Sequence, residues 1–188
     1  MQMRPDPSFA VHDHEQYRPV QALGDQRVRV RGRAGEGLLV CHASRPLEAL
    51  AGTAGELVVV VHGALRDSGR YLEHATAAAE QAGSAALIVA PQFLAAVDAG
   101  TGAGLPEGAL YWDVEGWKGA HPALGPAPLS SFTAMDSLLR QLARPQRRSP
   151  GGHPAVVIVG NSAGGQFVNR YAAVGRGPDA LAERGRPG

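Results

Sequence analysis

The sequence predicts an α/β protein with a doubly wound, mostly parallel sheet and an antiparallel hairpin at its N-terminal end. Three runs of apolar and largely β-branched residues carry this prediction, at residues 57–61, 85–90 and 155–159. Each run is apolar on both sides of the pleat, which is typical of strands that are covered on both faces. Segments with helical spacing alternate with these runs, and this alternation favours parallel strands joined by right-handed crossovers.

The N-terminal part has a different pattern. Residues 1–25 are polar and contain prolines, so we expect a loosely held lead-in before the domain. Residues 26–33 alternate like a half-exposed strand, and residues 37–42 form a second short run. Gly35-Glu36-Gly37 lies between them and has the composition of a turn. The two runs therefore predict a hairpin that supplies an antiparallel edge to the sheet.

Three helices are predicted from apolar residues at helical spacing. The first covers about residues 69–82 and has Ser68 as its cap. The second begins at Ser130 or Ser131 and ends before a proline. The third covers about residues 163–174, directly after the last buried run. Each helix separates or follows the buried runs, as a sheet with helices on both faces requires.

Residues 91–130 show no long periodic pattern. They contain Tyr111 and both tryptophans of the chain, Trp112 and Trp117, and they leave the carboxyl end of a predicted parallel strand, where such sheets bind ligands. We expect a lid-like or pocket-wall loop, with these three aromatic residues as substrate-pocket candidates. The alternative is an insertion that packs its aromatic side chains on the surface. Residues 26–188 otherwise read as one domain without repeats or linkers.

Composition and charge exclude several classes of function. Apolar residues make up 44% and charged residues 19% of the chain, and the net charge is +1, so neither nucleic acid nor an anionic membrane surface is favoured as a partner. Cys41 is the single cysteine, so we predict no internal disulfide and no cysteine-based zinc site. No run has the length of a signal-peptide core or a spanning helix, so we expect a cytoplasmic protein. We predict no cofactor and no metal.

The clearest chemical motif is Gly160-Asn161-Ser162-Ala163-Gly164, between a buried strand and a predicted helix. A serine in this context sits on a tight turn that lifts its hydroxyl clear of the sheet, and the flanking glycines let strand and helix close on the turn. The helix directs free N–H groups and its positive dipole end to the same place. We predict Ser162 as a nucleophile and the Ala163 N–H as an oxyanion donor. The alternative is an ordinary glycine-rich turn with an N-cap serine.

A second loop supports this interpretation. Residues 58–61 end in His62-Gly63-Ala64, again at the end of a buried strand and before a helix. Serine hydrolases of this architecture take their second oxyanion donor from the backbone of this loop. We predict that Ala64 donates this N–H and that Gly63 allows the chain to approach closely. His62 is expected to fix the loop rather than to act as a base, and Asp67 to begin the helix cap.

The two loops and their spacing resemble the α/β-hydrolase superfamily. The resemblance covers residues 25–175 and extends to a group of bacterial and fungal hydrolases without a sharply assigned substrate. It implies a sheet of the α/β-hydrolase type, with Ser162 as the nucleophile of an ester-type acyl transfer and with Ala64 and Ala163 in the oxyanion hole. The residues that carry the wider resemblance are Pro91-Gln92-Phe93, Tyr111-Trp112, Gly116-Trp117, Ser131-Phe132, Gly164-Gly165-Gln166 and Arg170-Tyr171.

The chain departs from the family pattern after the nucleophile. The family places an acid and then a histidine after the serine, but only the acids Asp179 and Glu183 follow Ser162, and no histidine does. A serine without a base is a poor nucleophile at neutral pH. We identify no triad acid or base in the chain, although His121 could fold over the serine. The other upstream histidines considered are His42, His62, His74 and His153.

The last buried run, residues 155–159, has the composition of a central strand but no later strand to pair with its outer edge. We expect that edge to favour self-association. The simplest account of the missing strand is that the chain is the front part of a longer protein. A frameshift or a premature stop would look the same.

Two functions remain. One is a serine hydrolase of an ester or related carbonyl substrate, and the other is an inactive, truncated hydrolase fold that acts as a binding or scaffold domain. A nucleotide-binding domain is disfavoured because neither phosphate-binding glycine motif is present.

Overall fold

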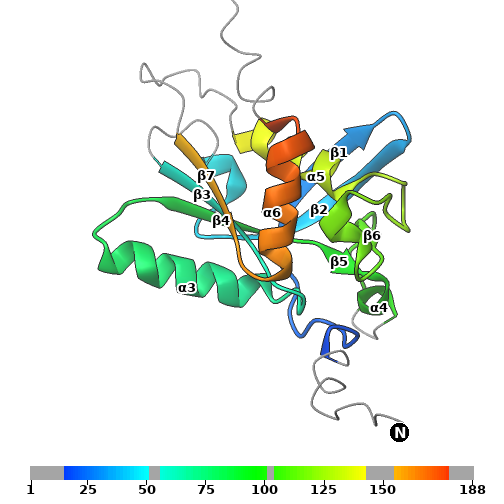
Figure 1. Cartoon of the computed structure of the whole chain (residues 1–188), viewed down its shortest axis with the longest axis horizontal. Helices are drawn as coiled ribbons and strands as arrows, with labels where there is room; N and C mark the ends of the chain where they lie inside the picture. Colours follow the sequence, from blue (N-terminus) through cyan, green and yellow to red (C-terminus); the bar gives the residue numbers. More distant parts are fainter. Residues whose placement is uncertain (1–14, 51–55, 101–103, 143–154, 178–188) are drawn as a thin grey trace, which may run out of the picture.

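A five-stranded sheet with helices on both faces forms the centre of the molecule (Figure 1). This computed structural model describes residues 15–50, 56–100, 104–142 and 155–177 of the 188-residue chain. The strands lie in the order β1-β2-β4-β3-β7, and β5 and β6 form a separate small sheet. The strands are β1 (Gln26–Gly32), β2 (Gly35–Ala43), β3 (Glu56–Val61), β4 (Leu87–Gln92), β5 (Leu94–Ala95), β6 (Tyr111–Trp112) and β7 (Ala155–Gly160).

The direction of the strands corrects the predicted fold class. β2 pairs antiparallel with β1 and β4, through seven and four residue pairs, whereas β3 pairs parallel with β4 and β7, through three and six. The sheet is therefore mixed, with slightly more antiparallel than parallel pairing, and the prediction of a mostly parallel, doubly wound sheet of the α/β-hydrolase type is wrong. The apolar runs identified strands buried on both faces, but burial does not set the direction of a neighbouring strand.

The hairpin lies at one edge of the sheet and is antiparallel, as predicted. Its first strand, β1, forms this edge, and its second strand lies between β1 and β4. β2 is nine residues long, so its first part pairs with β1 while residues 40–43 reach β4. A strand of this length can pair with two neighbouring strands. The alternation of apolar and polar residues could not indicate the second pairing.

Helices cover both faces of the sheet, as predicted (Figure 1). α3 packs on one face against β3 and β4, and α5 and α6 pack on the other face against the main apolar core. These three helices each begin within one residue of the predicted start. The helices are α2 (Leu47–Leu50), α3 (Ser68–Gln81), α4 (Ala96–Ala99), the 3-10 helix η1 (Gly116–Gly119), α5 (Ser131–Leu142) and α6 (Ala163–Val174).

The described part of residues 91–130 packs its tryptophans into the core, in contrast to the alternative of a surface insertion, and the lid-like or pocket-wall role stays a prediction. Trp112 and Trp117 are both 0% exposed. The ring of Phe93 stacks on that of Trp117 with centroids 5.4 Å apart and meets Trp112 edge-on at 5.7 Å. The segment lacks a visible period because its elements are only two to four residues long, and its aromatic rings face inward from different elements.

The described part of the lead-in, residues 15–25, is tied to the domain rather than loosely held. The guanidinium group of Arg66 donates hydrogen bonds to the carbonyl oxygens of Gln16 at 2.7 Å and Arg18 at 2.6 Å. The backbone N–H of Val20 donates to a carboxylate oxygen of Asp98 at 2.8 Å. The polarity and the prolines of this segment suggested a loose lead-in. Its hydrogen-bond partners lie far away in the sequence, so no local pattern indicates them.

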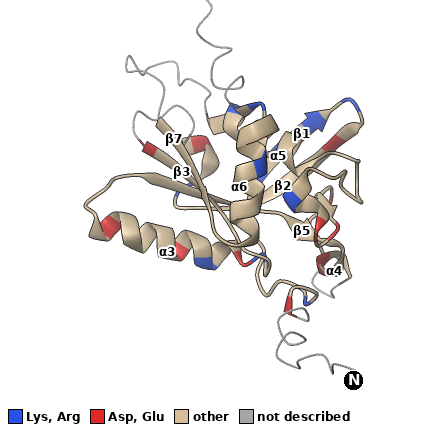
Figure 2. Cartoon of the chain, in the orientation of Figure 1, with Lys and Arg blue, Asp and Glu red and all other residues tan. Residues whose placement is uncertain are grey.

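Residues of both charge signs are distributed over many elements of the described chain (Figure 2). Arg29 and Arg31 project from β1 into solvent, where both approach Glu36 across the hairpin, at 3.5 Å and 3.2 Å. Exposed ion pairs of this kind contribute little to stability. In the described part of the chain, no helix is long and apolar enough to cross a membrane.

Candidate active site

Ser162 lies in the turn between β7 and α6, and its backbone is strained. Its φ is 54° and its ψ is −119°, a combination that residues with a side chain rarely adopt. Ser162 is exposed, and it makes no side-chain hydrogen bond to the helix N-terminus. The alternative of an ordinary N-cap serine therefore lacks its defining hydrogen bond, and the hydroxyl is presented to solvent at the end of the sheet.

Two glycines allow this turn to close. A Cβ atom on Gly160 would overlap the backbone of Gly164, and one on Gly164 would overlap the carbonyl groups of Val61 and His62. In both cases the obstacle is backbone, which cannot rotate away as a side chain could. Glycine is therefore required at both positions by close packing of β7, α6 and the end of β3.

The loop after β3 lies directly beside the serine turn. Val61 and Gly160 are register partners at the ends of β3 and β7, so the next residues of both strands leave the sheet together. A Cβ atom built on Gly63 would lie 3.9 Å from the carbonyl oxygen of Asn161 and 2.8 Å from the hydroxyl of Tyr71 on α3. The tertiary structure thus brings together the two loops that the sequence singled out separately.

The two predicted oxyanion donors are the backbone N–H groups of Ala64 and Ala163. Within the described residues, neither the N–H of Ala64 nor that of Ala163 donates a hydrogen bond. Ala163 is the first residue of α6, where free N–H groups and the helix dipole favour negative charge. Ala64 is half-buried and Ala163 is buried, so an anion held here would be partly shielded from water.

His62 is buried and uses both ring nitrogens to hold the loop. Its Nδ1 lies 2.8 Å from the Gly63 carbonyl oxygen, and its Nε2 accepts the backbone N–H of Phe93 at 2.9 Å. Nδ1 therefore carries the proton and donates it to Gly63. Burial is the main cause that lowers the pKa of His62 from 6.5 to about 4, so the ring is neutral at pH 7. Neither nitrogen is available to take a proton from a nucleophile.

A buried ion pair, which the sequence analysis missed, fixes the same loop from its other end. Arg66 and Asp98 are 0% and 1% exposed, and the Nε of Arg66 donates to the Oδ2 of Asp98 at 2.8 Å. Arg66 also donates to the carbonyl oxygen of Ala64 at 3.1 Å, and its own backbone has a φ of 59°. No local sequence signal pairs two residues 32 positions apart, and single charged residues are usually exposed.

No described histidine forms a hydrogen bond with Ser162. His42 Nδ1 lies 3.0 Å from the hydroxyl oxygen of Ser68, on the α3 side of the sheet. His74 lies on α3, and His121 packs beside Gly116 and Gly119 of η1. The remaining candidates for a base or an acid, His153, Asp179 and Glu183, lie outside the described residues.

The predicted substrate-pocket residues lie in or against the core. Trp112 donates its Nε1–H to the carbonyl oxygen of Leu129 at 3.1 Å. The Nε1 of Trp117 is buried without a hydrogen-bond partner among the described residues, and its ring lies 4.8 Å from that of His62. Tyr111 is half-buried. The indole of Trp117 therefore packs against His62 of the loop after β3, and both indoles are buried.

The described residues contain no cluster of three or more histidine, cysteine, aspartate or glutamate side chains that could hold a metal ion. Cys41 is fully buried, and burial raises the pKa of its thiol well above the usual range. A thiol in this state is a poor nucleophile and a poor metal ligand.

No protein-family model matches the chain, and comparison with curated proteins also gives no match. Among solved structures, the chain is similar to poly(aspartic acid) hydrolase-1 from Sphingomonas sp. KT-1, with 20% sequence identity and a TM-score of 0.46. The alignment covers 82% of this chain and 51% of that one, so the chain spans about half the length of the structure it matches. We therefore infer the function from the geometry of the two loops and not from this similarity.

Proposed function

We propose that this chain carries the nucleophile and the oxyanion hole of a serine hydrolase that cleaves an ester or a related carbonyl substrate. The observation that carries the proposal is the exposed Ser162, held at φ 54° between β7 and α6. Backbone strain of this kind persists only where the surrounding structure enforces it, and it is concentrated at functional sites. The backbone N–H groups of Ala64 and Ala163 belong to the two adjoining loops.

The proposed reaction uses these groups in sequence. The Ser162 Oγ attacks the carbonyl carbon as its proton passes to a base, and the carbonyl oxygen becomes an oxyanion that accepts hydrogen bonds from Ala64 and Ala163. The tetrahedral intermediate collapses, the alcohol leaves with a proton, and water then hydrolyses the acyl group from Ser162. Loss of a single oxyanion donor typically lowers kcat by about 10²- to 10³-fold.

The base and the acid of this reaction are proposed to come from outside the described residues, because no described histidine forms a hydrogen bond with Ser162. The resemblance to the α/β-hydrolase superfamily is retained as a proposal for the serine turn and the loop after β3, and it does not extend to the mixed sheet. Support for it comes from residues 61–64 and 160–164, whose backbones pack against each other.

A fluorophosphonate probe tests the nucleophile directly. Because no base is identified for Ser162, we expect the probe to label the 188-residue chain slowly at Ser162, with labelling lost in Ser162→Ala and kept in Ser84→Ala, a matched change at a serine outside both loops. Turnover of a p-nitrophenyl ester, where present, should follow the same pattern. Equal labelling of wild type and Ser162→Ala, with both proteins folded by circular dichroism, would contradict the proposal.

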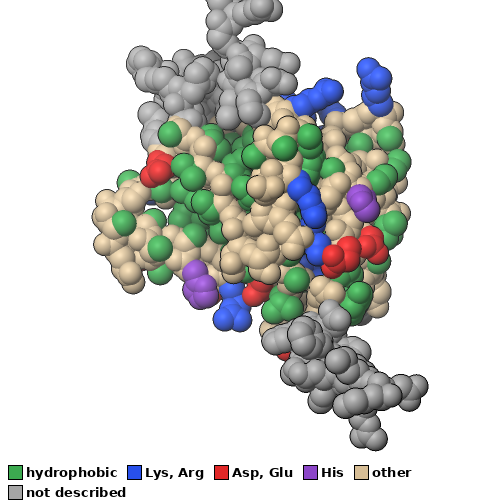
Figure 3. All heavy atoms as spheres, viewed as in Figure 1, with side chains coloured by type: hydrophobic (Ala, Val, Ile, Leu, Met, Phe, Trp, Pro, Cys, Tyr) green, Lys and Arg blue, Asp and Glu red, His purple; other side chains and the backbone are tan. Residues whose placement is uncertain are grey.

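The second candidate, a binding or scaffold domain without catalysis, is favoured by the outer side of β7. β7 is the last strand of the described sheet, and its Val157 and Val159 are 40% and 41% exposed. Figure 3 shows hydrophobic side chains gathered over this side of the molecule, between α3 and α6. The strand carries no charge, so a second copy could pair with it edge to edge without repulsion.

Sedimentation at increasing protein concentration distinguishes this candidate. We expect self-association that is weakened by Val157→Lys on β7 but not by Val174→Lys, the matched change at the exposed end of α6. A monomer at all concentrations would exclude pairing through β7. Labelling of Ser162 would then decide whether the chain retains the chemistry of a hydrolase.

A further inference from the structure

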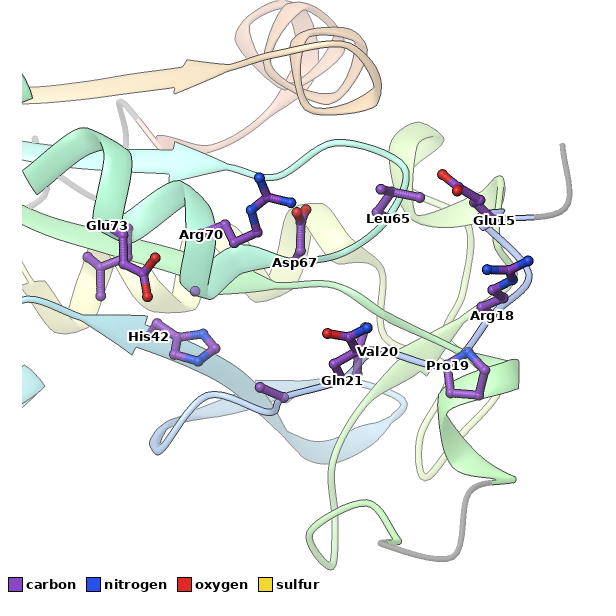
Figure 4. A pocket seen from close by; sticks show the side chains of 13 residues that line it. Glu15, Arg18, Pro19, Val20, Gln21, His42, Leu65, Asp67, Arg70 and Glu73 are labelled. Carbon is purple, nitrogen blue, oxygen red and sulfur yellow. The ribbon is translucent and has the colours of Figure 1, made fainter. Parts of the chain in front are cut away.

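A cavity of about 480 Å³ opens between the N-terminal half of α3 and the lead-in (Figure 4). Three segments form it, namely residues 15–22, His42 of β2 and residues 65–73. Its volume lies within the range of about 300–1,000 Å³ that is typical of small-molecule sites. Ser162 does not line it, and α3 covers the face of the sheet opposite to α6. The cavity is therefore separate from the proposed nucleophile.

The wall formed by the lead-in is anchored by buried groups. Arg66 donates to the carbonyl oxygens of Gln16 and Arg18, and Asp98 accepts the backbone N–H of Val20. Arg66 and Asp98 are themselves paired and almost fully buried. This wall consequently requires little ordering when a ligand enters, which reduces the entropic cost of binding.

His42 supplies a polar group on the floor of the cavity. Its Nδ1 is hydrogen-bonded to Ser68, while its Nε2 makes no hydrogen bond with the described residues. Figure 4 shows the ring directed into the space between α3 and the lead-in. Burial lowers the pKa of His42 below 6.5, against the opposing effect of Asp25 and Glu73, so the ring is neutral at pH 7. In the tautomer in which Nδ1 donates to the Ser68 hydroxyl, Nε2 can accept a hydrogen bond from a ligand N–H group.

Charged side chains of both signs surround the opening, and none of them forms an ion pair with a described residue. Asp67 stands at the N-cap position of α3, as predicted, although its side chain makes no capping hydrogen bond. With His42 neutral, the opening carries three carboxylates and two guanidinium groups. The excess of negative charge disfavours polyanions, and the presence of both signs suits a ligand with charges of both signs. The charged residues are Glu15, Arg18, Asp67, Arg70 and Glu73.

We propose that this cavity binds a small zwitterion with an ammonium group, a carboxylate and an apolar body, of the size of a dipeptide. The ammonium group faces Glu73 and His42, and the carboxylate faces Arg70. Apolar side chains of the ligand pack on Val20 and Leu72, which line the same space. This binding function is independent of Ser162 and of the hydrolase chemistry proposed for it.

The dipeptide leucyl-leucine is a suitable probe, with two derivatives that each lack one charge. We expect saturable NMR shifts of backbone amides in residues 65–73, with a Kd in the millimolar range or tighter. N-acetyl-leucyl-leucine, which lacks the ammonium group, and leucyl-leucine methyl ester, which lacks the carboxylate, should each bind about fivefold more weakly. Shifts that do not saturate, or that fall outside the cavity, would overturn the proposal.

Variants on the exposed side of α3 assign the two ends of the ligand. Arg70→Gln should weaken binding of the dipeptide and remove the difference between the dipeptide and its methyl ester. Glu73→Gln should weaken binding of the dipeptide and remove the difference between the dipeptide and its N-acetyl derivative. Glu80→Gln, on the same helix but away from the cavity, should change neither the affinity for the dipeptide nor these two differences. Equal weakening by all three variants would overturn the assignment, and loss of binding in Ser162→Ala would place the ligand at the serine turn instead.

Discussion

The loops that follow β3 and β7 lie side by side, yet they are held in place by opposite means. The turn after β7 depends on missing side chains, because a Cβ atom on Gly160 or Gly164 would overlap neighbouring backbone. The loop after β3 depends on buried polar side chains, His62 and Arg66, whose hydrogen bonds reach other parts of the chain. Both means fix the course of the backbone, but only the first leaves an exposed serine hydroxyl at the turn.

This difference has a consequence for the site. A glycine-closed turn is compact and can approach a neighbour closely, so it can present Ser162 at the end of the sheet. A loop clamped by polar side chains can hold a backbone N–H, such as that of Ala64, in one orientation without a regular element. A proposed nucleophile and a proposed oxyanion donor thus require different kinds of support, and each loop supplies one of them.

The largest effect is expected for Gly164→Ala, which tests the turn after β7. The added Cβ would overlap the carbonyl groups of Val61 and His62, so β3 and α6 would have to separate. We expect a loss of more than about 4 kcal/mol in the free energy of unfolding, or failure to fold. Gly165→Ala is the matched control, because its Cβ would lie 3.4 Å from the nearest atom, and it should be neutral or slightly stabilising. Equal urea midpoints for the two variants would refute the requirement for glycine.

The next effect concerns the clamp of the loop after β3. Arg66→Met removes one partner of a buried ion pair and leaves Asp98 charged and desolvated, so we expect a loss of about 3–5 kcal/mol by chemical denaturation. Arg29→Met, at an exposed ion pair with Glu36, should cost no more than about 1 kcal/mol. Similar losses in both variants would show that the buried pair does not clamp the loop.

His62 makes the same loop sensitive to acid. Its folded-state pKa of about 4 lies below the unfolded value of 6.5, so protonation favours unfolding. The stabilisation by the neutral ring is complete above pH 6.5 and is lost as the pH falls towards 4, by about 3 kcal/mol in total. Urea denaturation between pH 7 and 4 should show this loss in the wild type and a smaller one in His62→Gln. Parallel pH profiles would be inconsistent with a buried, neutral His62.

The smallest effect separates the two tryptophans behind the loops. Trp112→Phe removes a hydrogen bond to the Leu129 carbonyl oxygen, which keeps the backbone N–H of Ala123 as a donor, whereas Trp117→Phe removes an N–H group that has no described partner. The two changes delete similar volumes from the core. Thermal unfolding should therefore show Trp112→Phe to be less stable than Trp117→Phe by about 1–2 kcal/mol. The reverse order would imply an acceptor for the Trp117 indole.

Local patterns accounted for much of the molecule. The five strands of the large sheet and the three long helices followed from the period of apolar residues, because burial of one or two faces dictates that period. Ser162 could be recognised as the candidate nucleophile because the glycines beside it are close in sequence and their steric role is local. For the same reason, the loop at residues 62–64 could be identified from its place at the end of a buried strand.

Other features depend on contacts between residues far apart in the sequence. The antiparallel pairing of β2 with β4, the core position of Trp117 and the Arg66–Asp98 clamp each join segments that no local pattern connects. The sequence by itself determined which segments are strands and helices and where a strained serine turn forms, since these follow from short-range sterics and burial. Only the tertiary structure decided strand direction, the burial of the aromatic segment and the cavity beside α3, because these arise when distant segments compete for the same partners.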